Sequence, residues 1–394
     1  MMERVDGRLR ALVVGLALTC LLGWLFKSHC TARGWVDAIQ YTSGCYSDAV
    51  PFWGQRHVDE GLIPYFQTPM EYPVLTGLQI WVEGALARGM FGGAANAVSF
   101  LLAVTLVNAL LAGLILWMCA AAGMDRARLW LWAAAPPLIL YLGHNWDLGA
   151  ATLAVAAMLA ARRGQLVLAA ALAALGAAAK LFPVLLLPLI GLAALAAPDR
   201  GWRQRIATAA ACTFAAIAAW SAVNLPVALA APANWSEFYR FSQERSGTAA
   251  STWEILSTQQ IWVTGIAERN LYAAAAFLAG ASAIVALGWR QHRAQLWVLF
   301  TPVLAWFMLT NKVWSPQFDL WLYPLLVMTS PRLKPIALFV IGDIAAYFAE
   351  FWWFAAATPN AWPYATPHDI LLAASVRGVA MLWLIADAVR LPAP

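Results

Sequence analysis

The sequence predicts an all-α polytopic membrane protein with about twelve transmembrane helices, and three observations support this fold class. Hydrophobic residues make up 62% of the 394 residues and charged residues only 11%, against about 25% charged in soluble domains. Several uncharged stretches run for roughly 16–25 residues, the length needed to cross about 30 Å of hydrocarbon. The 22 tryptophans suit aromatic belts at the two membrane interfaces. We therefore expect a single integral-membrane domain over residues 1–394.

Short basic clusters give the predicted topology, because lysine and arginine favour the cytoplasmic side of a membrane. Placing all seven clusters inside requires six out-and-back hairpins and puts both termini in the cytoplasm. The clusters are Arg4/Arg8/Arg10, Arg126/Arg128, Arg162/Arg163, Arg200/Arg203/Arg205, Arg290/Arg293, Arg332/Lys334 and Arg390. The predicted spans are 11–26, 97–121, 129–143, 148–161, 165–179, 182–197, 206–225, 270–288, 295–310, 318–329, 335–354 and 369–389. A cleaved signal peptide is the alternative for the first span, but no small-residue cleavage pattern follows it.

The segment 74–89 is apolar enough to be mistaken for a further span. If it crossed the membrane, Arg126 and every later basic cluster would move outside. It also carries Glu83 and Arg88, which are costly in lipid. We therefore predict a juxtamembrane or re-entrant helix there, within a first extracytoplasmic loop at 27–96. A second large outer loop is expected at 226–269. Both loops contain a few arginines, but the preference of basic residues for the cytoplasmic side is weaker in long loops.

The five cysteines do not show the spacing of a metal site. Three lie in apolar spans and are expected to pack as small residues. Cys30 and Cys45 share the first outer loop, where they either pair as a disulfide or stay free. No cofactor is expected, although a divalent metal is not excluded. The basic residues are scattered in short loops rather than gathered in a stripe, so a nucleic-acid partner is not expected.

Polar side chains gather on the predicted outer side of the membrane. Of the four lysines in the chain, Lys27, Lys180 and Lys312 all fall there, against the usual charge bias. A transporter would be expected to place its polar groups near the bilayer midplane, in broken helices. Gathering at one interface instead favours an active site at the membrane surface.

Four blocks resemble the polyprenyl-phosphate-sugar-dependent glycosyltransferases of the GT-C fold, and most closely glycosyltransferase family 87 from actinobacteria. They occur in the order of that family and spread over most of the chain. The blocks are CYSDAVPFWGQRHVDEGLIPYFQTPMEYPVLTG (Cys45–Gly77), GHNWDLGAATLAVAAMLAARR (Gly143–Arg163), GAAAKLFPVLLLPL (Gly176–Leu189) and NKVWSPQFDLWLYPLL (Asn311–Leu326). In the first block the shared pattern is an Asp soon after the first span, then Pro-Tyr, then Glu-Tyr-Pro.

The resemblance implies inverting transfer of a sugar, often mannose, from a polyprenyl phosphate to a lipid or glycan acceptor on the extracytoplasmic face of the cell membrane. The other partners would be membrane lipids, and no nucleotide sugar would be used. Two alternatives from other classes stay open. One is a non-catalytic carrier or flippase for polyprenyl-linked sugars, and the other is a structural scaffold for an envelope-synthesis complex.

The expected general base is Asp48, which by resemblance occupies the position of the family's catalytic Asp. A carboxylate within hydrogen-bond reach would take the proton of the attacking acceptor hydroxyl. The alternative is a structural role, because Ser47-Asp48 precedes a helical stretch that Asp48 would cap. Asp147 is expected to bind substrate, and its alternative role is likewise to cap the helix that follows it.

Cations are expected to bind the donor phosphate, whose charge grows as it leaves. The candidates are Lys312, Lys180 and Arg377. Lysines at helix ends also extend to the interface without any function, and an arginine as deep as Arg377 needs a partner, for which Asp343 or Glu350 is available. The further expected substrate-binding residues are Glu71, Tyr72, His144 and Asn145, of which Glu71 serves alternatively to hold its loop.

Overall fold

The computed structural model describes residues 2–394, and their side chains except those of residues 2–8 and 33. The side chains of Arg4 and Arg8, used above to place the N-terminus, therefore lie outside the described residues. Within the described chain the structure is almost entirely helical, and its only β-type pairing is an isolated bridge between Pro64 and Thr68. The predicted all-α class is confirmed.

The helices follow one another closely along the chain. The α-helices are α1 (Met2–Ser28), α2 (Ile39–Thr42), α3 (Ala49–Gln55), α4 (Val74–Phe91), α5 (Ala97–Ala121), α6 (Arg126–Ala133), α7 (Pro136–Tyr141), α8 (Asp147–Arg162), α9 (Leu166–Ala179), α10 (Leu186–Ala196), α11 (Trp202–Ala230), α12 (Pro232–Glu244), α13 (Thr252–Thr258), α14 (Ile266–His292), α15 (Phe300–Thr310), α16 (Asp319–Thr329), α17 (Lys334–Ala355) and α18 (Pro367–Arg390). Short 3₁₀ turns are η1 (Thr31–Arg33), η2 (Gly92–Ala94), η3 (Phe182–Leu185), η4 (Leu296–Leu299) and η5 (Pro316–Phe318).

Six of these helices are long and apolar enough to cross a membrane. They are α1 from Leu9 onward, α5, α11, α14, α17 and α18. Each coincides with a predicted span, and α5 matches the range 97–121 at both ends. The other six predicted spans correspond to shorter helices, so the count of twelve stays a prediction.

Proline accounts for the main differences between the expected spans and the observed helices. The span expected at 129–143 is divided into α6 and α7 just before Pro136, because proline removes a backbone donor and disfavours helical geometry in the residue before it. The seventh span is expected to end at residue 225, just before Pro226, but the helix does not end there. Helix α11 accommodates this proline and continues to Ala230, so the second large loop begins later and folds into α12 and α13.

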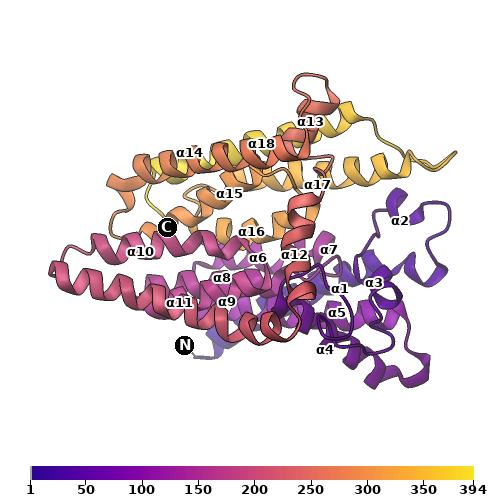
Figure 1. The fold of residues 1–394 in the computed structure, drawn as a ribbon, viewed down its shortest axis with the longest axis horizontal. Helices are drawn as coiled ribbons and strands as arrows, with labels where there is room; N and C mark the ends of the chain where they lie inside the picture. The colour runs from indigo at the N-terminus through magenta and orange to yellow at the C-terminus, as the bar shows by residue number, and fades with distance from the viewer. Residues whose placement is uncertain (1) are drawn as a thin grey trace.

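The long helices run side by side along the longest axis of the molecule (Figure 1). Helix α9 packs against α8 and α11, and α17 packs against α18. The α10–α11 connection lies at the left end of the view, opposite α2 and α3 at the right. The basic segment 200–205 and the first large loop are therefore at opposite ends of the bundle.

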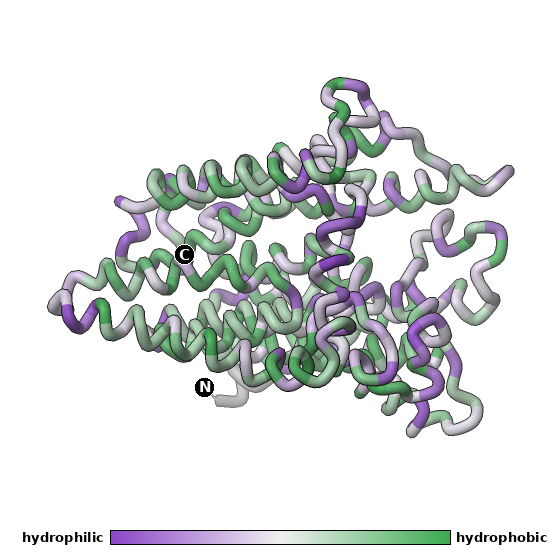
Figure 2. The backbone as a smooth tube through the Cα atoms, in the orientation of Figure 1, coloured by the Kyte–Doolittle hydropathy of each residue, from purple (hydrophilic) through white to green (hydrophobic). Residues whose placement is uncertain are grey.

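Apolar residues cover the outer surface of the bundle as well as its interior. Figure 2 shows the hydrophobic colours along the long helices, with the hydrophilic colours mainly on α12 and the end loops. Only 11% of the apolar window in α11 and 17% of that in α14 is buried. Exposed side chains such as Phe214 and Leu278 belong to these helices. An apolar face turned outward at this length is typical of a helix in contact with lipid.

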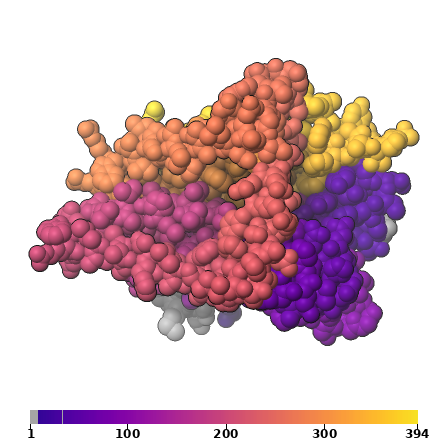
Figure 3. Space-filling view, viewed as in Figure 1, coloured from indigo at the N-terminus to yellow at the C-terminus, as the bar shows by residue number. Residues whose placement is uncertain are grey.

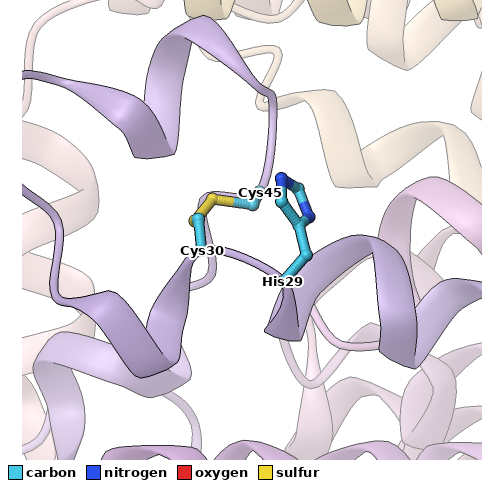
Figure 4. Close-up of side chains that lie close together, drawn as sticks. All are labelled: His29, Cys30 and Cys45. Atoms are coloured by element: carbon cyan, nitrogen blue, oxygen red, sulfur yellow. A yellow bond between two sulfur atoms is a disulfide. The ribbon is translucent and has the colours of Figure 1, made fainter.

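The first loop folds into a compact cap whose start is fixed by a disulfide between Cys30 and Cys45 (Figure 4). This resolves the open question about the two cysteines. His29 lies beside the pair, but sulfurs bonded to each other offer no thiolate ligand for a metal. The segment expected to be helical at 74–89 forms α4, which is not among the six candidate spans. Its Glu83 is buried and accepts hydrogen bonds from Gln79 and Trp146.

Candidate active site

A cavity of about 630 Å³ lies where the first loop meets the ends of the long helices. Its walls come from the first loop, the segments after α7 and α9, helix α12, the segment between α15 and α16, and the end of α17. Helix α12 crosses the front of the molecule beside it (Figure 3). Seven of the nine expected site residues line the cavity: Asp48, Glu71, Tyr72, His144, Asn145, Lys180 and Lys312. Asp147 and Arg377 are not in the lining.

Asp48 is the N-cap residue of α3, and its side chain points toward the segment that follows α7. Its backbone N–H donates to the carbonyl of His144 at 2.9 Å. Its Oδ2 accepts a hydrogen bond of 2.5 Å from Nδ2 of Asn145. The side chain makes no capping hydrogen bond to α3, so its contacts are with the cavity wall rather than with its own helix.

The environment of Asp48 makes its carboxylate more basic than an exposed one. Burial raises the pKa of Asp48 above its ordinary value, because the ionised form loses hydration. Hydrogen bonds from Tyr46 and Asn145 and the positive charge of Lys180 act in the opposite direction, but burial is the largest effect. A raised pKa suits a general base that works near neutral pH.

Asn145 connects Asp48 to the other polar residues of the cavity. Its Nδ2 also donates to the hydroxyl of Tyr72 at 2.8 Å, and its Oδ1 accepts from Nζ of Lys180 at 3.3 Å. The segment carrying Asn145 is itself held by Asn108, which donates to the carbonyls of Leu142 and Asn145. These bonds fix the amide orientation, since its oxygen faces a cation and its nitrogen faces a carboxylate.

Lys180 and Asp147 form a buried ion pair with an N–O distance of 3.3 Å. Lys180 ends α9, where the helix dipole favours a cation, and its Nζ lies 4.4 Å from the ring centre of Tyr72. Asp147 begins α8 and accepts a further hydrogen bond of 2.6 Å from Nε1 of Trp321. Asp147 thus acts on the cavity through Lys180, whose charge it largely compensates.

Two other cations in the cavity wall have no carboxylate partner among the side chains that the structure describes. Nζ of Lys312 donates to the backbone carbonyl of Gln243 at 2.8 Å. The guanidinium of Arg245 stacks over the ring of Phe241 at 5.3 Å. Burial, and then the nearby positive charges of Arg245 and Arg269, lower the pKa of Lys312. Two such cations facing one cavity are an anion-binding arrangement, because an anion would relieve their mutual repulsion.

Arg377 lies outside the cavity lining, within the packing of α18. It pairs with Asp319 at 2.9 Å, and its guanidinium carbon lies 3.7 Å from the ring centre of Trp314. The sequence pointed to Asp343 or Glu350 as its structural partner, but the ion pair is made with a carboxylate on α16. Its Nε and Nη2 have no hydrogen-bond partner in the structure.

Glu71 forms a two-point ion pair with Arg56, with contacts of 2.7 and 2.8 Å. The pair joins the segment after α3 to the segment before α4, which is the loop-holding role considered for Glu71. His144 is buried beside Nζ of Lys27, 3.1 Å from its Nδ1. Burial and then the charges of Lys27 and Lys180 lower the pKa of His144, so its imidazole is neutral. Lys27 also donates to the carbonyl of Tyr46, two residues before Asp48.

Three residues of the cavity wall were missed as site residues in the sequence. Tyr46 lines the cavity and helps to lower the pKa of Asp48. Arg245 is the second unpaired cation, and Glu350 lines the cavity from α17. Arg245 carried a usable signal, since it is a positive charge on the predicted outer side. Tyr46 had none beyond its closeness to Asp48 in the sequence. Glu350 was considered only as a partner for Arg377.

No family model and no curated protein matches the sequence. Among solved structures, the chain is similar to the crystal structure of ArnT from Cupriavidus metallidurans bound to undecaprenyl phosphate. The sequences are 14% identical, the match covers 99% of this chain and 77% of that chain, and the TM-score is 0.45. Similarity at this level does not assign the chain to a family.

Proposed function

We propose that this protein is an integral-membrane glycosyltransferase of the GT-C type. It transfers a sugar, with mannose as the first choice, from a polyprenyl phosphate to a lipid or glycan acceptor on the extracytoplasmic face, with inversion at the anomeric carbon. The observation that carries the proposal is the content of one cavity: a buried, bonded carboxylate at Asp48 together with the cations Lys180, Lys312 and Arg245. The outward apolar surfaces of α11 and α14 support a membrane location.

In this reaction the acceptor hydroxyl attacks the anomeric carbon and gives its proton to the Asp48 carboxylate. The bond between that carbon and the phosphate oxygen breaks, and the bonding electron pair leaves with the polyprenyl phosphate. The negative charge on the phosphate then grows, and fixed cations lower the energy of that state. Lys312 and Arg245 are best suited to this role because neither is neutralised by a protein carboxylate. Lys180 is the third cation of the cavity, and its charge is largely neutralised by the ion pair with Asp147. It also orients Asn145 through a hydrogen bond.

Arg377 has a smaller part in this proposal than the sequence implied. Its ion pair with Asp319 and its contact with Trp314 place it against the segment that carries the cavity wall at Ser315 and Pro316. From there it supports the wall next to Lys312. Glu71 and Tyr72 also line the cavity, where Tyr72 contacts both Asn145 and Lys180.

The test is an in vitro transfer assay with labelled polyprenyl-phosphate mannose and extracted lipid acceptors. Asp48→Asn keeps the shape of the side chain but removes the base, so transfer should fall by roughly 10²–10⁴-fold. Asp59→Asn is the matched control, because Asp59 is an exposed carboxylate of the same loop and its loss should leave the rate unchanged. A folded Asp48→Asn protein with the wild-type transfer rate would refute Asp48 as the general base. Absence of transfer by folded wild type would refute the enzyme and favour a carrier.

A further inference from the structure

Glu350 is a buried carboxyl that lines the cavity without a bonded partner. Its residue is 2% exposed, and it is in the lining of the cavity near the end of α17. Among the side chains that the structure describes, none makes a hydrogen bond or an ion pair with it. Arg377, the cation considered as its partner in the sequence, is bonded to Asp319 and acts on Glu350 only through its charge, without a hydrogen bond or ion-pair contact. Its carboxyl is therefore left to bond to molecules in the cavity, and a ligand that supplied a hydrogen bond would be favoured here.

Aromatic rings from two parts of the chain line the same cavity as this carboxyl and pack against one another, and they are called the aromatic wall below. Tyr41 and Tyr46 come from the first loop, and Phe351 and Phe354 from the same helix as Glu350, and all four line the cavity. The ring of Tyr41 lies 5.6 Å from that of Phe354, and the ring of Tyr46 lies 5.6 Å from that of Phe351. Flat apolar faces with one precisely placed polar group are the usual composition of a small-molecule subsite.

The aromatic wall includes a residue close to Asp48 in the chain. Tyr46, whose ring is part of it, lies two residues before Asp48 in the chain, and its side chain is one of the groups that lower the pKa of Asp48. Lys312 and Arg245 come from the segment after α15 and the end of α12, where Lys312 bonds to the carbonyl of Gln243 and Arg245 lies over Phe241. An acceptor sugar bound at the aromatic wall would therefore be near Asp48, and a donor phosphate bound by Lys312 and Arg245 would lie on another part of the cavity wall.

We infer that Glu350 and the aromatic wall of Tyr41, Tyr46, Phe351 and Phe354 form a subsite for a glycosyl unit of the acceptor, which the Glu350 carboxyl binds through sugar hydroxyls. The C–H face of a pyranose ring matches an aromatic surface, and a carboxyl group can form hydrogen bonds with sugar hydroxyls in either of its protonation states. A site that bonds a particular hydroxyl rejects an analogue that lacks it. The inference rests on the proposed function for naming this sugar the acceptor, and it implies that the acceptor is already glycosylated.

The first experiment measures binding and needs no catalysis. Purified protein in lipid nanodiscs is titrated with a panel of methyl hexopyranosides and their monodeoxy forms, and binding is followed by saturation-transfer NMR. Wild type should bind at least one glycoside and lose that binding when one hydroxyl is removed. Glu350→Gln should weaken binding by about tenfold with little change in Tm. Equal binding by wild type and a folded Glu350→Gln, or binding of no glycoside by folded wild type, would overturn the inference.

A second pair of variants covers the case in which Glu350→Gln does not fold. Phe354→Leu removes one ring from the wall, whereas Phe348→Leu removes a ring from the same helix that packs on Phe26 and Trp352 and is not in the cavity lining. Binding of the glycoside should weaken in Phe354→Leu and be retained in Phe348→Leu. Equal affinity of the two variants would contradict the role of the wall.

A kinetic experiment separates this inference from the proposed function. In the transfer assay, Glu350→Gln should raise KM for the acceptor about tenfold and leave KM for the polyprenyl donor unchanged. A raised donor KM instead would show that the sugar bound by Glu350 belongs to the donor and would overturn the assignment to the acceptor. If wild type binds glycosides through Glu350 but transfers nothing, the proposed function fails while the sugar subsite stands.

Discussion

Asn145 donates a hydrogen bond of 2.5 Å to the carboxylate of Asp48, a residue 97 positions earlier in the chain. The same amide contacts Tyr72 and Lys180, so one side chain joins four separate parts of the sequence at the cavity. The bond stabilises the ionised form of Asp48 and fixes the direction in which its oxygens point. Both effects would matter for a general base, because proton transfer depends on geometry as well as on pKa.

Asn145→Ala should therefore change the pH dependence of transfer as well as its rate. The hydrogen bond from Asn145 lowers the pKa of Asp48, so its loss raises that pKa further. Asp48 then becomes ionised only at higher pH. The acidic limb of the kcat/KM profile should therefore shift to higher pH. The measurement is a pH–rate profile of the variant and of wild type. A variant that is slower but keeps the acidic limb in place would show that Asn145 only supports the fold.

The alkaline limb of the same profile should report on Lys312. Burial and neighbouring cations place the pKa of Lys312 below its ordinary value of 10.5, so its positive charge is present at lower pH and is lost as pH rises through the lowered pKa. Lys312→Arg keeps the charge at any accessible pH. The alkaline limb of the profile should therefore shift to higher pH in Lys312→Arg. An unchanged limb would show that the titration of another group causes the loss of activity at high pH.

Removing the unpaired cations should weaken donor binding without unfolding the protein. Charge-assisted hydrogen bonds contribute roughly 1.5–3 kcal/mol, so Lys312→Met and Arg245→Met should each raise KM for the donor by about tenfold or more. Arg240→Met is the matched control, since Arg240 lies on α12 but is exposed and already paired with Glu237. Equal effects of Arg245→Met and Arg240→Met would contradict a phosphate site at Arg245.

The contact between α17 and α18 gives a prediction for stability. A methyl group on Gly342 would lie 2.6 Å from the backbone N and Cα of Arg377, and backbone atoms cannot move aside. Gly342→Ala should therefore cost about 1–3 kcal/mol by overpacking and lower the Tm in nanodiscs. Gly113→Ala in α5 is the control, because its added methyl meets nothing within 4 Å. A Tm for Gly342→Ala at or above that of Gly113→Ala would show that the two helices separate easily.

Much of the fold was predictable because it depends on local composition. Uncharged apolar stretches of spanning length must form helices in lipid, where every backbone group needs an internal partner, and the range 97–121 was predicted to the residue. The placement of Lys27, Lys180 and Lys312 on the predicted outer side likewise indicated that the polar site lies at one end of the bundle. Where a single residue decided a boundary, as at Pro136 and Pro226, the sequence was less reliable, since neighbouring helices determine whether a proline breaks a helix.

The sequence by itself determined the helical class, the positions of the long apolar helices and the gathering of Asp48, Asn145, Lys180 and Lys312 toward one cavity. Only the tertiary structure decided how the charges pair: Lys180 with Asp147, Arg377 with Asp319, and Glu350 with none. The physical reason is that an ion pair forms only over a few ångströms. Which residues come that close depends on how helices distant in the chain approach each other, and no local pattern records that distance.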